Sequence, residues 1–446
     1  MNISYEKVRD FAKFVKYLIP SIIGMLFISL YATVDCYFLA NYGTVDELAG
    51  VNIVLPYMNL AWGIAVMIAT GSSALIGIKI GKGKIEKAKT DFSSIFLTLF
   101  LSSVVLMVVS LMFSDSILGI LGANEKLFLV SQVYLLATII ATPILVTKLF
   151  LEYYIRLDGS PRFSMAVSTV GLILNIVIDY ITIAVLGKGV WGAGFSTVLS
   201  TLISALLAIS YFIYFPKVLK FVRPYWNPEL LKKSITNGFS ELFTEISSGI
   251  VIVLFNFVIL GYKGEVGVAS VAVVLNIYYI LLSIYLGIAS GAQPLISVNY
   301  GKKNKLNLKR VMVYCRNLIA LSSVLIFIFA QNFNVSIVNV FAGDKKELFA
   351  IALNGFDLFS YCFLFLGVNI YTSSFYTSIG NGKISALISL LRSLVFVIIA
   401  LIILPKFWGV NGVWWSVPVA EALTMLFSLT LYYLFVERYF MVKKYN

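Results

Sequence analysis

The sequence contains no histidine, few charged residues and only three cysteines. Without histidine, the usual imidazole metal ligand, catalytic base and pH switch are missing, so any proton chemistry must use carboxylates. Charged residues make up 12% of the chain, against about 25% in a typical soluble protein. The cysteines lie in or beside apolar stretches without metal-ligand spacing, which argues against a disulfide framework or a zinc site (Cys36, Cys315 and Cys362).

What the chain has in abundance is apolar sequence. Hydrophobic residues make up 60% of its 446 residues, and the mean hydropathy is +0.94. This composition predicts an all-α membrane protein that crosses the bilayer many times, and it excludes a cytosolic enzyme, a secreted disulfide scaffold and a disordered binder. Twelve apolar stretches are long enough to span the hydrocarbon core, near residues 15–40, 49–78, 92–113, 127–150, 164–185, 192–215, 238–260, 267–297, 317–341, 348–379, 384–404 and 412–436.

The distribution of lysine and arginine predicts the orientation of these spans. Most of the 34 basic residues lie in the N-terminal segment, in the C-terminal tail and in the loops that follow even-numbered spans. The positive-inside rule therefore places both termini in the cytoplasm of a protein of the cell (inner) membrane. Because the basic residues lie in short loops, we expect no nucleic-acid partner. The opposite loops contain few basic residues (Lys126, Lys188, Lys263, Lys345, Lys346 and Lys406).

The sequence contains an internal repeat. When residues 68–82 are aligned with 288–302, seven of 15 positions are identical. We therefore expect two lobes of six spans each, residues 1–220 and 221–446. Because each lobe has an even number of spans, the two insert in the same orientation and a pseudo-twofold axis runs along the membrane normal. Such parallel repeats are typical of transporters that work by alternating access.

Two carboxylates in the first half, Asp35 and Asp179, lie deep in the predicted spans. Lys16 and Arg162 mark the cytoplasmic ends of the two helices that carry them. At a rise of about 1.5 Å per residue, both acids lie roughly 26–28 Å from these ends. A charge in hydrocarbon is costly, so each intramembrane acid is a candidate for function.

Three polar residues are expected near these acids. Asn175 lies one helical turn before Asp179 and shares its helix face, and Tyr31 has the same relation to Asp35. Thr197 lies about 12 Å below the outer loop, at a similar depth. We expect Asp35, Asn175, Asp179 and Thr197 to form one cation site, with Tyr31 a candidate for lining a cavity.

The repeat suggests that the two acids serve one lobe only. In the alignment of the two halves, Asp35 corresponds to Phe255 and Asp179 to Ile399. A lobe-specific acid pair favours proton or sodium binding, since two close carboxylates can hold a proton near neutral pH. The alternative is that each acid only hydrogen-bonds a neighbouring helix.

The remaining intramembrane acids carry weaker predictions. Glu241 and Glu245 form an i,i+4 pair on the seventh span and either line a cavity or satisfy the start of that helix. Asp357 is a further candidate for cavity lining, and the role of Glu421 stays open. Glu152 lies closer to the end of a span.

Taken together, these motifs resemble the multidrug and toxic compound extrusion (MATE) family. The resemblance covers nearly the whole chain, with twelve spans in two lobes and basic loops after spans 2 and 8. Its motifs are the stretch Val34–Ala49, the N-x-x-x-D motif of span 5, the WGAGFST motif at 191–197, and the turns IRLDGSPR and TSIGNGK after spans 4 and 10. Each motif is loose, but their order along the chain is fairly specific.

The resemblance implies a V-shaped bundle that exports cationic, amphipathic small molecules in exchange for H⁺ or Na⁺, without a further cofactor. In the branch with its coupling site in the first lobe, the corresponding residues are Asp35, Asn175, Asp179 and Thr197. A second branch uses a carboxylate in span 7 and another after span 10. Here the matching span-7 position is Ser248 and the IGNGK turn has no acid. This departure favours the first-lobe site.

Two other functions, a lipid flippase and an intramembrane enzyme, would require residues different from those of an antiporter. A flippase for lipid-linked oligosaccharides would share the architecture but should need a cationic cavity for pyrophosphate. An intramembrane enzyme would need a catalytic constellation, and we expect none in a chain without histidine or a metal-ligand cluster. Each chain should contain a complete two-lobe cavity, so we expect it to function as a monomer among membrane lipids.

Overall fold

The computed structural model describes residues 11–343 and 345–441, and every regular element within these ranges is a helix. Eleven of the described helical segments are long and apolar enough to cross a membrane. One of them, α8 (Pro228–Gly301), has 74 residues and would be about 110 Å long as a straight helix. Gly264 interrupts it with φ 60° and ψ −153°, so α8 is two spans. The predicted all-α membrane fold with twelve spans is confirmed.

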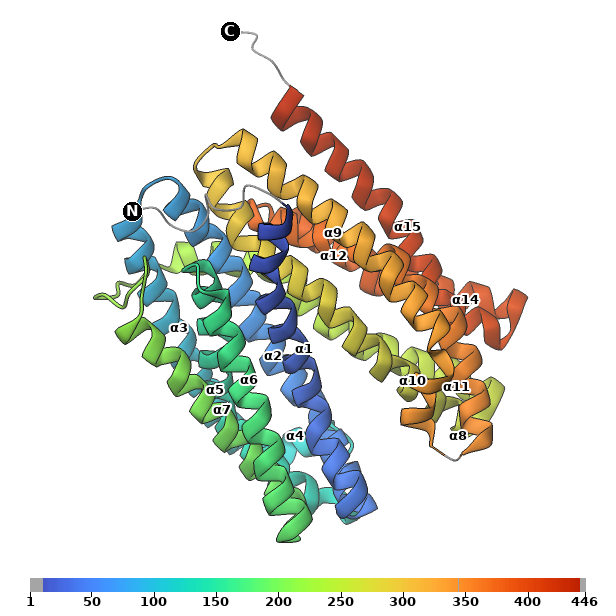
Figure 1. Ribbon diagram of the computed structural model, residues 1–446. Coiled ribbons are helices and arrows are strands. Elements are labelled where there is room, and N and C mark those ends of the chain that lie inside the picture. Colours follow the sequence, from blue (N-terminus) through green and yellow to red (C-terminus); the bar gives the residue numbers. More distant parts are fainter. Residues whose placement is uncertain (1–10, 344, 442–446) are drawn as a thin grey trace.

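The first half of the described chain forms the bundle on the left of Figure 1, which we call the N-lobe. Its elements are α1 (Phe11–Tyr42), α2 (Val45–Gly81), α3 (Ile85–Met112), α4 (Ser114–Ile120), α5 (Glu125–Leu157), α6 (Pro161–Asp179), the π-helix η2 (Tyr180–Val185) and α7 (Gly189–Tyr214).

The second half, which we call the C-lobe, forms the bundle on the right of Figure 1. After α8 it contains α9 (Lys305–Asn332), α10 (Asn334–Ala342), α11 (Lys346–Phe359), η3 (Ser360–Cys362), α12 (Phe363–Ser378), α13 (Gly382–Leu390), the π-helix η4 (Leu391–Val395), α14 (Phe396–Trp408), α15 (Val410–Val436) and η5 (Glu437–Met441).

Several helix ends differ from the predicted span boundaries. The third and ninth spans begin at Ile85 and Lys305, earlier than the expected residues 92 and 317. Hydropathy detects only the part of a helix inside the hydrocarbon, whereas a helix can continue into the aqueous phase with polar side chains. The ninth apolar stretch was also expected to continue to residue 341, but the helix breaks at Phe333 and α10 follows as a separate short helix.

The backbone repeats between the two halves. Gly83 has φ 76°, and Lys303, which the repeat aligns with it, has φ 55° as the one non-glycine residue with positive φ in the described ranges. Gly189 and Gly409 form a second such pair, with φ 49° and 55°. Positive φ is unfavourable for a residue with a Cβ, so its recurrence at aligned positions shows that both halves follow one chain path.

The two lobes meet along α2 and α8. In Figure 1 the bundles lie close together at the end that carries the N-terminus and diverge toward the end that carries α4 and α10. Positions that the repeat aligns touch each other at this contact: the side chain of Gln293 donates to Ser73 Oγ at 3.4 Å, and a Cβ at Gly77 would lie 3.0 Å from Ser297 Cβ. The pseudo-twofold axis therefore passes between α2 and the second half of α8.

The joined end of the molecule carries the basic turns. The short turns 82–84 and 302–304 lie there, together with the segment 216–227 that connects the lobes. We call it the basic end. The prediction that both termini lie in the cytoplasm falls partly on residues 1–10 and 442–446, which lie outside the described residues.

The connecting segment is bound to the N-lobe. The Asp158 carboxylate, at the end of α5, accepts the backbone N–H groups of Lys217, Val218 and Leu219 at 2.7–2.8 Å. It also accepts the Tyr211 hydroxyl at 2.7 Å. One buried carboxylate thus fixes the start of this segment to α5 and α7.

Candidate functional site

Asp35 lies in the interior of the N-lobe and binds three other helices. Its carboxylate accepts the Tyr134 hydroxyl of α5 at 2.8 Å, the Asn175 side-chain amide of α6 at 3.0 Å and the Thr197 hydroxyl of α7 at 2.7 Å. The side chain is 5% exposed. The surrounding apolar spans shield the carboxylate from water, and the three donors provide the hydrogen bonds that a buried carboxylate requires. Three of the four residues predicted for the cation site are therefore in direct contact.

Asp179, the fourth residue, lies beside this group and is fully buried. It is close enough to Asp35 and Ser196 to interact with both, but neither of its carboxylate oxygens receives a hydrogen bond in the described structure. The side-chain oxygen of Asn175 is also buried without a donor. We call Asp35 and Asp179 the acid pair.

The unpaired oxygens define what the site can bind. An unsatisfied buried acceptor is costly, and here three such oxygens, two on Asp179 and one on Asn175, lie on neighbouring turns of α6. A proton or a small hard cation would provide the missing positive partner, because carboxylate and amide oxygens are suitable ligands for hard cations. Within the described residues, no group of three or more His, Cys, Asp or Glu side chains could hold a metal ion.

Tyr31 extends the site along α1 and α7. Its hydroxyl lies 2.8 Å from Ser200 Oγ and 3.1 Å from Thr201 Oγ1, and it donates to the Thr197 carbonyl at 3.2 Å. Tyr31, a candidate for lining a cavity, therefore hydrogen-bonds within the N-lobe, next to Asp35.

The sequence did not indicate Tyr134 or Ser196. Ser196 donates to the Asn175 carbonyl at 3.1 Å and accepts its side-chain amide at 3.0 Å, which orients the amide toward Asp35. Ser196 stands beside Thr197 in the WGAGFST motif, so that motif could have identified it. Tyr134 is one of 26 tyrosines, and only its position on α5 distinguishes it from the others.

Glu241 and Glu245 lie on the first half of α8, away from the acid pair. A Cβ at Gly63 of α2 would lie 3.2 Å from Glu245 Cβ, so Glu245 faces the opposite lobe. Neither side-chain carboxylate has a hydrogen bond or ion pair with another described residue, although Glu241 is within electrostatic range of Arg392. Two acids near the contact of the lobes are therefore available to a positively charged ligand.

The other two candidate acids, Asp357 and Glu421, lie in the C-lobe. Asp357 accepts the Asn334 side-chain amide at 2.6 Å, so it contacts the start of α10 rather than Glu241 or Glu245. Glu421 is buried and accepts Asn369 at 2.7 Å and Arg392 at 3.4 Å. Thus the C-lobe neutralises its buried acid with an arginine, whereas the acid pair of the N-lobe has no such direct partner in the described structure.

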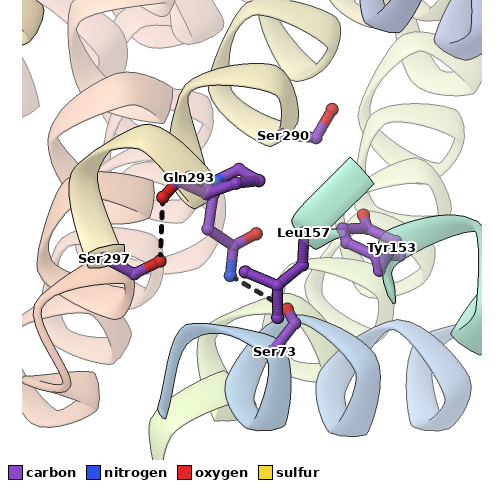
Figure 2. A pocket seen from close by; sticks show the side chains of 7 residues that line it. Ser73, Tyr153, Leu157, Ser290, Gln293 and Ser297 are labelled. Atoms are coloured by element: carbon purple, nitrogen blue, oxygen red, sulfur yellow. Dashed lines mark hydrogen bonds between the residues drawn. The ribbon is translucent and has the colours of Figure 1, made fainter. Parts of the chain in front are cut away.

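A small pocket lies where the lobes meet (Figure 2). Its lining comes from both lobes, with Gln293 reaching from α8 to the Thr70 carbonyl of α2 at 2.8 Å and to Ser73. These hydrogen bonds join α2 to α8, so the two lobes are in contact on the side of the basic end. The pocket is lined by Ser73, Tyr153, Leu157, Ser290, Gln293, Pro294 and Ser297.

Twelve apolar spans in two repeated lobes, with a buried acid pair in one of them, define a multi-pass membrane transporter. The chain belongs to the MATE family, because the MatE family profile matches residues 20–181 and 241–402, one match in each lobe. Relatives include the multidrug export protein MepA of Staphylococcus aureus (strain bovine RF122 / ET3-1), which is 26% identical over 450 residues, covering 97% of this chain and 96% of the relative. MepA of Staphylococcus saprophyticus is 24% identical, with the same coverage.

Solved structures show the same fold. A MATE crystal structure in complex with MaL6 superposes with a TM-score of 0.90 at 21% identity, covering 95% of this chain and 96% of the other. An outward-facing multidrug resistance MATE transporter of the MOP superfamily also gives 0.90 at 21% identity, with 95% of both chains covered. These relatives and structural neighbours are transporters, not enzymes.

Proposed function

We propose that this protein is a secondary active exporter, which exchanges a coupling cation, H⁺ or Na⁺, for cationic amphipathic compounds by alternating access. Family membership and the names of the relatives support multidrug export. We place the protein in the cell membrane with both termini in the cytoplasm, as the basic loops indicate. Residues 1–220 and 221–446 would be the two moving lobes of a functional monomer.

The observation that carries this proposal is the unequal hydrogen bonding of the acid pair. Asp35 has three donors, whereas Asp179 and the Asn175 oxygen have none in the described structure. Burial without a partner favours binding of a proton or cation at Asp179. The corresponding C-lobe positions are Phe255 and Ile399, so the coupling site would exist once per molecule.

Helix α1 provides a physical route from this site to the other lobe. It carries Asp35, and it also packs against α8, where a Cβ at Gly291 would lie 3.0 Å from Ser21 Cβ. Ser29 donates to the Tyr279 carbonyl of α8 at 3.3 Å. Cation binding would change the hydrogen bonds that hold α1 to α5, α6 and α7, and thereby bias the contact between the lobes.

We assign substrate recognition to Glu241 and Glu245. Their carboxylates lack a hydrogen-bonding partner among the described residues, and the Glu245 side chain lies against Gly63 of the opposite lobe. A cationic amphipathic compound would pair its charge with these acids and pack its apolar part between the lobes, where removal from water strengthens the charge interaction.

The proposal is tested by ethidium efflux from proteoliposomes under a pH gradient or a sodium gradient, each imposed separately. We expect transport to follow one of the gradients, and Asp35→Asn to reduce it to the level of empty liposomes. The matched control is Asp115→Asn, because Asp115 lies on α4 and hydrogen-bonds only Ser114 and Gln132 among described residues. Transport that is unaffected by Asp35→Asn, or that is absent under both gradients after confirmed reconstitution, would overturn the proposal.

A further inference from the structure

Three charged side chains on α5 are buried inside the N-lobe and have no part in the proposed function. Lys148, Glu152 and Arg156 are 5%, 0% and 2% exposed. Their spacing of one helical turn places them on one face of the helix. Charges at such positions are costly and rare in membrane proteins. We call these three residues the α5 charge row.

Lys148, at one end of the row, contacts the network of the acid pair. Its ammonium group lies 5.2 Å from the centroid of the Tyr31 ring, and Tyr31 stands one helical turn before Asp35. A Cβ at Gly171 of α6 would lie 3.3 Å from Lys148 Nζ, so the side chain fills the space between α1 and α6. Lys148 has no carboxylate hydrogen-bonded to it in the described structure.

Glu152 and Arg156 complete the row. Arg156 Nη2 lies 3.6 Å from Glu152 Oε2, and Arg156 Nε donates to Ser164 Oγ at 3.0 Å. Neither carboxylate oxygen of Glu152 receives a hydrogen bond in the described ranges. Glu152 interacts electrostatically with both Lys148 and Arg156. With all three side chains ionised, the row combines two positive charges with one negative charge, a net charge of +1.

This charge complements that of the acid pair. Asp35 and Asp179 carry −2 when both are ionised, so the acid pair and the α5 charge row are together neutral when the pair has bound one monovalent cation. Asp158, also buried and two residues beyond Arg156, is held separately by the N–H groups of the connecting segment. The other titratable groups facing this region are Tyr31 and Cys36 on α1, Tyr134 and Tyr153 on α5, and Glu241 on α8, which interacts with Tyr153. The facing residues of α7 are hydroxyl side chains.

We propose that the α5 charge row is the fixed countercharge of the acid pair, and that it sets the cation concentration at which the pair loads. This inference rests on the proposed role of the acid pair in coupling. Lys148, Glu152 and Arg156 are positioning residues, because they act on the cation through the electric field in the lobe and do not bind it. One bound H⁺ or Na⁺ makes the five side chains of the acid pair and the charge row neutral together, so we expect one cation in the loaded state.

The sign of the effect separates this role from a purely structural one. Lys148→Met lowers the net charge of the row to zero, so the acid pair holds its cation more tightly. Glu152→Gln raises the net charge to +2, so the pair holds its cation more weakly. Each should shift the half-maximal cation concentration by about tenfold, in opposite directions, since a nearby charge typically changes cation binding by this order.

The experiment measures ethidium efflux from proteoliposomes while the pH or sodium concentration of the outer solution is varied. We expect half-maximal transport at lower cation concentration for Lys148→Met and at higher concentration for Glu152→Gln. The double variant keeps the net charge of +1 and should return to the wild-type value. The charge-conserving Lys148→Arg and Glu152→Asp should also remain close to wild type.

Folding is checked by size-exclusion chromatography of each purified variant. Arg156→Gln provides an independent test if another single variant does not fold, because it also lowers the net charge to zero and should shift transport in the same direction as Lys148→Met, by less. Shifts of one sign for all variants, no shift in folded variants, or a double variant that does not return would overturn the inference. The proposed function fails separately, if Asp35→Asn retains gradient-driven transport.

Discussion

At the scale of single residues, the two carboxylates of the acid pair differ in their hydrogen bonding. Asp35 accepts three hydrogen bonds from three helices, and Asp179 accepts none among the described residues. A hydrogen bond to a charged acceptor contributes about 1.5–3 kcal/mol, so these donors hold the Asp35 carboxylate in place between α5, α6 and α7. Asp179, without such donors, is left to bind the cation.

Tyr134→Phe tests the contribution of these donors. The change removes the hydroxyl that lies 2.8 Å from Asp35 and destabilises the cation-free carboxylate. We expect half-maximal gradient-driven transport at a roughly tenfold lower cation concentration. Tyr57→Phe is the matched control, because Tyr57 bonds Ser110 and Thr142. Equal behaviour of the two variants would contradict this role of Tyr134.

Glu245→Gln tests substrate recognition. Removing one of two acids near the lobe contact should weaken ethidium binding by about tenfold, equivalent to about 1.4 kcal/mol, as measured by fluorescence anisotropy. Glu229→Gln is the control on the same helix, where Glu229 is paired with Lys233 at 2.6 Å at the exposed start of α8. An ethidium affinity that is unchanged in Glu245→Gln would remove Glu245 from the proposed site.

The sequence predicted the acid pair but not all of its surroundings. Depth along the helix places Asp35 and Asp179 at one level, and helical periodicity adds Asn175. Tyr134 could not be predicted, because its role depends on the rotation of α5 about its axis, which is set by packing. The pairing of Glu421 with Arg392 likewise joins α15 to η4, and it leaves no local pattern in the sequence.

At the scale of helices, the connection between the lobes depends on the end of α5. Asp158 holds three consecutive N–H groups of the connecting segment, and Ser93 and Ser94 of α3 accept the N–H groups of Val222 and Tyr225 at 2.9 and 3.0 Å. The segment is therefore anchored to the N-lobe, and we expect bending between the lobes to occur closer to Pro228.

Asp158→Ala should release this segment. Each N–H group left without an acceptor costs roughly 1–3 kcal/mol, so we expect a destabilisation of about 3 kcal/mol. The measurements are the thermal-unfolding midpoint in detergent and the rate of proteolysis within residues 216–227. Asp115→Ala, at the opposite end of the N-lobe, should change neither. If proteolysis in the segment were unchanged, Asp158 would not be its anchor.

Hydropathy predicted the spans better than their ends. It located the spans because the hydrocarbon thickness sets their length. It could not locate the starts of α3 and α9, where charged residues continue the helix beyond the membrane. The break between α9 and α10 at Phe333 lies among three polar residues, Gln331, Asn332 and Asn334, which are too few to interrupt the surrounding apolar stretch in a hydropathy average.

At the scale of the whole molecule, two similar lobes meet on their pseudo-twofold axis. Ser73 and Gln293 occupy corresponding positions in the two halves, and their side chains form a hydrogen bond. Gly77 and Ser297 also occupy corresponding positions, and they pack closely against each other. The sequence repeat predicted two equivalent halves. It could not predict which corresponding positions touch, since the same repeat is compatible with several arrangements of the lobes.

A disulfide across this contact should stop transport. With the native cysteines replaced, Gly77→Cys and Ser297→Cys bring together Cβ atoms that would lie 3.0 Å apart. This is closer than the roughly 3.5–4.5 Å of disulfides, so α2 and α8 must separate slightly as the bond forms. We expect oxidation to abolish ethidium efflux and a reductant to restore it. The control pair Ser373→Cys and Ser385→Cys lies within the C-lobe and should permit transport when oxidised. Efflux by the oxidised interlobe pair would contradict alternating access at this contact.

The most direct test of the central claim is the linkage between ethidium binding and the coupling cation. Ethidium affinity of the purified protein is measured by fluorescence anisotropy as pH or sodium concentration is varied. Our account predicts that wild type and Asp115→Asn bind ethidium more weakly as the coupling cation increases, because the two ligands favour different states. It predicts that Asp179→Asn binds ethidium with an affinity independent of both. If Asp179→Asn kept the wild-type dependence, the acid pair would not be the coupling site.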